Sequence, residues 1–156
     1  MKNKSDYVAK ICEIMNSDIF RNKIKLANTY YSNLKQENLI RNTILENLND
    51  FFEKEFPNLK AFAEHPRTPN SRVDLSIINE EDIINDNKQS YKIEFKYQFS
   101  GDCNDLKDYS KIINKDYEIR ESDLFILIVS HWDKTEKKEF DKKWGITTNL
   151  SRYIAK

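Results

Sequence analysis

The stretch SYKIEFKYQF, residues 90–99, decides the fold of this chain. Its apolar residues recur at every second position from Tyr91 to Phe99, and this alternation predicts a β-strand with one buried face. The stretch RVDLSIIN, residues 72–79, alternates in the same way. The polar residues 80–89 lie between the two, so we expect an antiparallel hairpin.

Pairing the two apolar faces places a set of polar side chains together on the opposite face of the hairpin. These residues are Asp74, Ser76, Glu94, Lys96 and Gln98. Two registers remain open. A hairpin centred on Ile84 puts Asp74 across from Glu94, a like-charge pair that is unfavourable unless a cation or a bound proton neutralises it. A hairpin centred on Asn85 puts Asp74 across from Lys96, as an ordinary ion pair.

The rest of the chain alternates between helical and strand patterns. Helical spacing predicts two helices before residue 34 and a longer one from Leu34 to Phe56. We expect further elements after it: a strand over residues 59–65, a helix around residues 106–113, a fully buried strand at residues 124–129, and a charged helix after Asp133. This order predicts an α/β fold with a mixed central sheet. Residues 1–33 would form an N-terminal helical extension, and residues 34–156 the core with its C-terminal helix.

Composition narrows the class of protein. The 156 residues carry 26 Lys and Arg against 26 Asp and Glu, which disfavours a grossly basic nucleic-acid-coating protein. The charge is unevenly spread, with a net +4 over residues 1–41 and a net −5 over residues 42–90. There are only two cysteines, no apolar run that could span a bilayer and no apolar leader pattern. We therefore expect a cytoplasmic protein without a membrane segment.

One acidic residue falls on the apolar face of the predicted long helix. At about 100° per residue, Glu37 lies within roughly 20° of Ile44 and Leu48. A carboxylate on a buried face is unfavourable unless it is paired or binds a cation. Arg41, one turn further on, is either its ion-pair partner or a group that neutralises phosphate.

Asp74, followed twenty positions later by the tripeptide Glu94-Phe95-Lys96, resembles the D…ExK signature of the PD-(D/E)XK, or restriction-endonuclease-like, nuclease superfamily. The resemblance implies an αβββαβ core, which matches the order of elements expected from residue 34 to residue 130. It also implies that Asp74 and Glu94 bind the metal, that Lys96 positions or activates water, and that Glu37 is the acidic residue of the helix and a third metal ligand. Val73 replaces the proline of the signature.

This resemblance implies a Mg²⁺-dependent endonuclease that hydrolyses the phosphodiester bonds of nucleic acid, with Mn²⁺ as a substitute metal. We expect DNA as the substrate and a homodimer as the assembly, since two sites are needed to cut a duplex. Four side chains are candidates for contact with the substrate: Arg41, Arg67, Arg72 and Gln98.

Other interpretations of the same residues remain. Taken alone, the polar face of residues 90–99 is typical of a solvated sheet surface, and a second Glu-x-Lys occurs at Glu136 and Lys138 within a charged run. The alternative function is a non-catalytic binding module, an immunity or anti-defence factor that acts through protein partners. The acidic tip of the hairpin favours it, because such a tip repels phosphate.

Overall fold

The computed structural model describes residues 4–30, 36–64, 66–68, 71–84, 90–99, 106–130 and 134–145. Its helices are α1 (Lys4–Asn16), α2 (Asp18–Tyr30), α3 (Glu37–Glu55), α4 (Glu80–Ile84), α5 (Leu106–Ile119) and α6 (Lys134–Trp144). Its strands are β1 (Leu59–Ala63), β2 (Pro66–Thr68), β3 (Ser71–Arg72), β4 (Leu75–Asn79), β5 (Tyr91–Phe99) and β6 (Leu124–Ser130). Within these ranges no helix is both long and apolar enough to span a membrane.

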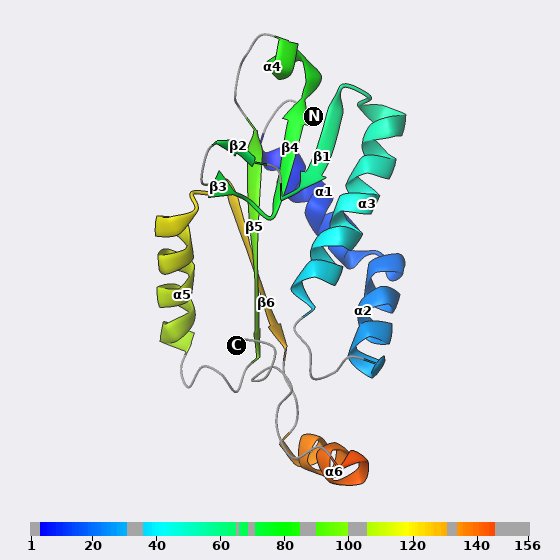
Figure 1. Cartoon of the computed structure of the whole chain (residues 1–156). Helices are drawn as coiled ribbons and strands as arrows, with labels where there is room; N and C mark the ends of the chain where they lie inside the picture. The colour runs from blue at the N-terminus through cyan, green and yellow to red at the C-terminus, as the bar shows by residue number, and fades with distance from the viewer. Residues whose placement is uncertain are drawn as a thin grey trace.

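The main sheet has four strands in the order β1-β4-β5-β6. The pairs β1–β4 and β4–β5 are antiparallel, whereas β5–β6 is parallel because α5 carries the chain back between them. Figure 1 shows α5 on one face of the sheet and α1, α2 and α3 on the other. The prediction of an α/β fold with a mixed sheet and N-terminal helices is confirmed.

The hydrophobic core lies between the sheet and the N-terminal helices. The apolar stripe of α3, with Ile44 and Leu48 fully buried, packs against β1 and β5 within one hydrophobic core. Ile11 of α1 is also in this core at 1% exposure, so the N-terminal helices share one core with the sheet. Tyr7 of α1 lies 5.0 Å, centroid to centroid, from Tyr91 of β5, and burial raises the pKa of both phenols. The domain boundary expected near residue 34 falls in residues 31–35, outside the described ones.

The register of the hairpin follows the first of the two alternatives. Leu75 pairs with Ile93 and Ile77 with Tyr91, so the hairpin is centred on Ile84. Continuing this register by one residue puts Asp74 across from Glu94. The connection is not the simple loop that its polar composition predicts, because residues 80–84 form the short helix α4.

The polar face of the hairpin is buried rather than solvated. Ser76, Glu94 and Gln98 are exposed by only 1%, 5% and 7%. An ordinary outer face would leave such side chains in water, because burial of polar groups is unfavourable without compensation. The solvated-surface interpretation is therefore wrong for these three residues.

Two predicted strands differ in detail from the observed ones. The stretch expected as a single strand over residues 72–79 is divided, because the chain bends at Val73 and Asp74 between β3 and β4. The apolar strand β6 is not fully buried. Among the described strands it pairs only with β5 and lies at the edge of the sheet, where Val129 is 46% exposed.

The amide of Asn49 joins α3 to β1 and supports a first prediction. Its Nδ2 donates to the carbonyl oxygen of Ala61 at 3.1 Å, and its Oδ1 accepts from the Ala61 amide at 2.9 Å. Replacing Asn49 by Ala leaves both backbone groups unsatisfied, so we expect the free energy of unfolding to fall by about 2 kcal/mol.

Urea denaturation measures this change. The control is Asn38→Ala on the exposed side of the same helix, which should change stability by less than about 0.5 kcal/mol. Equal stabilities of the two variants would show that the Asn49 bridge does not contribute.

Candidate active site

Two of the predicted acidic residues accept hydrogen bonds from the backbone of β5. The Phe95 amide donates to Asp74 Oδ2 at 2.8 Å, and the Tyr97 amide donates to Glu37 Oε2 at 2.7 Å. Strand β4 begins only at Leu75, so the part of β5 beyond Ile93 has no pairing with β4. The two carboxylates satisfy amides that a longer β4 would have paired.

These contacts explain where the two carboxylates lie. Glu37 occupies the first turn of α3, where a negative charge is favourable next to the helix dipole. Asp74 lies in the bend that precedes β4, and its own carbonyl oxygen accepts from the Glu64 amide at 3.0 Å. A helix terminus and a bend, 37 positions apart in the chain, thus place their acids along the same edge of β5.

Glu94 is the most buried of the acidic residues at this site. Its side chain is 6% exposed, and its Oε2 lies 3.7 Å from Nη1 of Arg120. It lines the same cavity as Asp74. A buried carboxylate next to a second carboxylate is unfavourable in water-poor surroundings unless cations balance the charge.

These side chains line one cavity of about 150 Å³. Its lining residues are Glu37, Asp74, Glu94, Phe95, Lys96, Ile119 and Arg120. Phe95 is 3% exposed and its ring belongs to the core on the other face of the sheet, so its backbone is the part that borders the cavity. The four residues expected at the active site, Glu37, Asp74, Glu94 and Lys96, therefore all line the same hollow.

The donor chemistry of the cavity suits a hard divalent cation. Three carboxylates face two basic side chains, which leaves an excess of negative charge. Within the described part of the chain, no three His, Cys, Asp or Glu side chains form a ready-made metal site. Mg²⁺ does not need such a cage, because it usually takes one or two carboxylates and keeps water or phosphate oxygens as its other ligands. The facing pair Asp74 and Glu94 fits that requirement.

Three of the four predicted substrate contacts do not line this cavity: Arg41, Arg72 and Gln98. Arg41 does not pair with Glu37. Its Nη1 lies 2.9 Å from Glu64 Oε1, its Nε donates to Asn42 Oδ1 at 3.1 Å, and its side chain is 11% exposed. Gln98 is buried on the same face of β5 as Glu94, two residues beyond Lys96.

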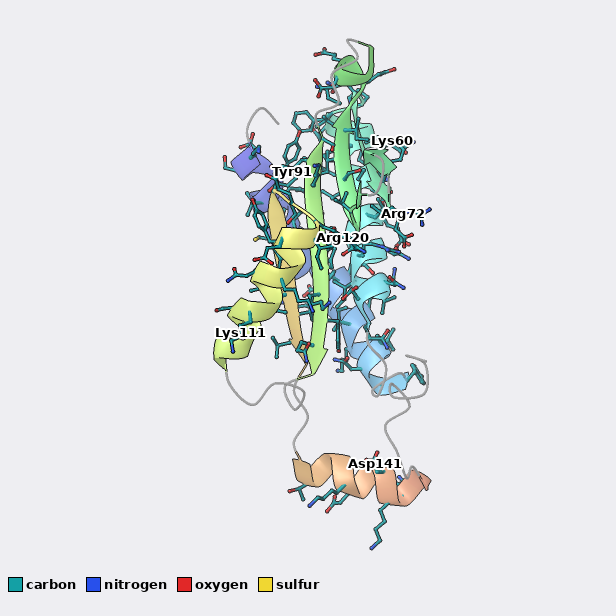
Figure 2. All side chains as sticks on the ribbon, turned by 60° about the vertical axis from the view of Figure 1, so that its left-hand side comes forward. Lys60, Arg72, Tyr91, Lys111, Arg120 and Asp141 are labelled. Atoms are coloured by element: carbon teal, nitrogen blue, oxygen red, sulfur yellow. The ribbon has the colours of Figure 1, made fainter. Side chains whose placement is uncertain are left out.

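The remaining two predicted contacts are in the small β2–β3 hairpin. Arg72 in β3 is exposed, and Figure 2 labels it at the side of the molecule away from α5. Arg67 lies in β2, and its side chain is outside the described ones. Pro66, expected to end a strand, instead begins this hairpin by pairing with Arg72.

Sequence reasoning missed Arg120, which lines the cavity and faces Glu94. Figure 2 shows it where the end of α5 reaches β5. The expected order of elements could have indicated this position. A helix that connects two parallel strands ends near the beginning of the first strand, which here carries Glu94. Arg120, in the turn that joins α5 to β6, is the basic residue at that place.

Comparison with known proteins gives no relative: no family model, curated protein or solved structure matches this chain.

The capping contacts predict opposite effects for two substitutions of Asp74. Asp74→Ala removes the acceptor for the Phe95 amide, and in metal-free buffer it should lower the free energy of unfolding by about 1–3 kcal/mol. Asp74→Asn keeps an acceptor oxygen and removes the like charge across from Glu94. We therefore expect it to be at least as stable as the wild-type protein.

Chemical denaturation in the presence of a chelator measures both variants. A large loss of stability in Asp74→Asn would contradict the view that Asp74 and Glu94 repel each other in the metal-free protein.

Proposed function

We propose that this chain is a Mg²⁺-dependent endonuclease of the PD-(D/E)XK, restriction-endonuclease-like type. The observation that carries the proposal is the convergence of Glu37, Asp74, Glu94 and Lys96 on one cavity. These residues come from α3, the bend before β4, and β5. An ordinary sheet surface gives no reason for four ionisable groups to gather in a single hollow.

The order of elements supports the same proposal. From Glu37 to Ser130 the main elements follow the sequence α3, β1, β4, β5, α5 and β6, which corresponds to the αβββαβ pattern. The β2–β3 hairpin and α4 are insertions between these elements. The proposal therefore rests on topology together with the positions of four side chains.

In the proposed reaction, Asp74 and Glu94 would hold Mg²⁺, and Glu37, which lines the same cavity, would be a third carboxylate ligand. The metal when bound supplies charge stabilisation for the phosphoryl oxygens and lowers the pKa of a bound water. Lys96, two residues beyond Glu94 on the same face of β5, orients the attacking water or a non-bridging phosphate oxygen through its ammonium group. The strand fixes the backbone positions of Glu94 and Lys96 relative to each other. Substrate binding therefore does not have to bring these two residues together.

DNA is the proposed substrate, and its backbone would run past the β2–β3 hairpin. Arg72 is exposed there and can meet a phosphate directly. Arg41 would have to leave its ion pair with Glu64 before it could bind a phosphate, so we propose that Arg41 contributes less than Arg72 to DNA binding. Arg67 and Gln98 remain proposed contacts from the sequence.

The test of this function is cleavage of a labelled DNA duplex and of a single strand in Mg²⁺ and in Mn²⁺. We expect Lys96→Ala and Glu94→Gln each to lose at least about 100-fold in rate, because each removes a group that acts in the transition state.

The matched control is Lys92→Ala, which removes a lysine from the same face of the same strand but away from the cavity. It should keep the wild-type rate. Equal rates for Lys92→Ala, Lys96→Ala and Glu94→Gln would exclude these residues as the active site.

A homodimer through α2 is the second part of the proposal, because cutting both strands of a duplex requires two sites. Three large apolar side chains on α2 are exposed: Ile19 by 69%, Leu26 by 58% and Tyr30 by 74%. Their spacing of seven and four positions places them on one side of the helix. A second copy of the chain, with the same row facing it across a two-fold axis, would cover them.

Light scattering after gel filtration tests this interface. Leu26→Asp should convert a dimer to a monomer, since it places a charge in the middle of the row. Asn28→Asp adds the same charge about 200° further round the helix and should leave the dimer intact. A monomeric wild-type protein would contradict the proposed interface.

One observation favours a different function, a non-catalytic module that binds protein partners. The short helix α4 presents Glu80, Glu81 and Asp82 at the tip of the hairpin. Such an acidic tip repels nucleic acid but can bind a basic protein surface. Absence of cleavage, together with absence of calorimetric heat from Mg²⁺ and Mn²⁺, would favour this function over the nuclease.

A further inference from the structure

We propose that Arg120 exchanges partners during the reaction: it balances the charge of Glu94 in the metal-free protein and binds a substrate phosphate once a divalent cation is present. This inference rests on the proposed nuclease function and adds a specific role for a residue outside the D…ExK pattern.

Arg120 faces a buried carboxylate. The side chain of Glu94 is 6% exposed and lines the same cavity as Asp74, so a nearby positive charge reduces the cost of burying it. Arg120 provides a positive charge 3.7 Å from Glu94 Oε2. That separation exceeds a normal hydrogen bond, so the pair is held by charge attraction and can separate without breaking a well-aligned bond.

Arg120 is partly exposed to solvent. Its side chain is 48% exposed although it lines the cavity, so the guanidinium lies between the buried Glu94 and solvent. The residue occupies a bend immediately after α5, at the place where Figure 2 shows α5 close to β5. A group in this position can turn outward towards a polyanion without disturbing the core.

The side chain of Arg120 is chemically suited to phosphate. Its planar guanidinium offers paired N–H donors that match phosphate oxygens. Lys96 offers a compact ammonium on the strand itself. The two cations of the cavity are therefore suited to different tasks, Lys96 to the reacting water and Arg120 to the phosphate.

Partner exchange makes two predictions of opposite sign. In the metal-free protein Arg120 competes with the metal for the charge of Glu94, so its removal should tighten metal binding. In the complex Arg120 contacts phosphate, so its removal should weaken nucleic-acid binding. A residue with only a structural role would weaken both or change neither.

The experiment compares wild type, Arg120→Ala and Arg120→Lys. Titration calorimetry with MnCl₂ gives the metal affinity, and fluorescence anisotropy with a labelled DNA duplex in CaCl₂ gives the nucleic-acid affinity. For Arg120→Ala we expect the Kd for Mn²⁺ to fall at least about fivefold. The Kd for DNA should rise about tenfold, as expected for a lost charged hydrogen bond.

The conservative variant and a control separate charge from geometry. Arg120→Lys keeps the positive charge, so its Mn²⁺ affinity should stay near that of the wild type, while its DNA affinity should be only partly restored. Lys115→Ala removes an exposed positive charge from α5 outside the cavity and should leave Mn²⁺ affinity unchanged.

Three results would overturn the inference. Unchanged Mn²⁺ affinity in Arg120→Ala would show that Arg120 does not compete with the metal, and unchanged DNA affinity would show that it does not bind phosphate. In both cases the nuclease proposal stands if the wild type cleaves DNA. A wild-type protein that neither binds Mn²⁺ nor cleaves DNA would remove the proposed function and this inference together.

Discussion

The unequal lengths of β4 and β5 are the constraint on which the site depends. Strand β5 continues to Phe99, while β4 begins at Leu75 and pairs with β5 only as far as Ile93. The amides of Phe95 and Tyr97 consequently need acceptors, because unsatisfied backbone groups in a protein interior are unfavourable. Asp74 and Glu37 supply them, and this brings two carboxylates to the strand that carries Glu94 and Lys96. This local requirement of the backbone thus brings two of the three carboxylates to the cavity.

The same arrangement concentrates negative charge in a place of low exposure. Neutral acceptors such as Asn and Gln would satisfy the same amides. They would do so without placing three carboxylates around a cavity of about 150 Å³. Asp74 and Glu37 accept from the two amides of β5, and Glu94 is buried at the same cavity. An arrangement that is unfavourable for stability is what a functional site is expected to show. The two cations at the cavity, Lys96 and Arg120, reduce this repulsion and leave an excess of one carboxylate.

Much of the fold follows from local pattern. The period of two in residues 90–99 and the helical stripe around Ile44 and Leu48 both identify their elements correctly, because burial of one face enforces these periods. The division of residues 72–79 was not predictable in this way. The apolar alternation continues through Val73, which is buried, and gives no sign of the bend at Asp74.

The site was predicted in part for the same reasons. Placement of Glu94 and Lys96 on one face follows from strand geometry, and Glu37 stands out as an acid on an apolar helix face. Asp74 reaches the cavity from the bend before β4 and not from a strand. The choice between the two hairpin registers depends on α4, whose helical turn a polar linker sequence does not reveal. Arg120 was missed because it lies next to Glu94 only through the parallel pairing of β5 with β6. The sequence predicts that Arg41 pairs with Glu37 or binds phosphate. Its guanidinium instead pairs with Glu64, which lies in the bend that follows β1.

The most direct test of the central claim is a crystal structure of the protein grown with MnCl₂, with the metal located by its anomalous scattering. The account predicts an anomalous peak inside the cavity, bonded to carboxylate oxygens of Asp74 and Glu94, with the Phe95 and Tyr97 amides still donating to Asp74 and Glu37. A cavity without an anomalous peak at saturating Mn²⁺, with both amide contacts in place, would contradict it. The acids would then serve only to cap the backbone of β5.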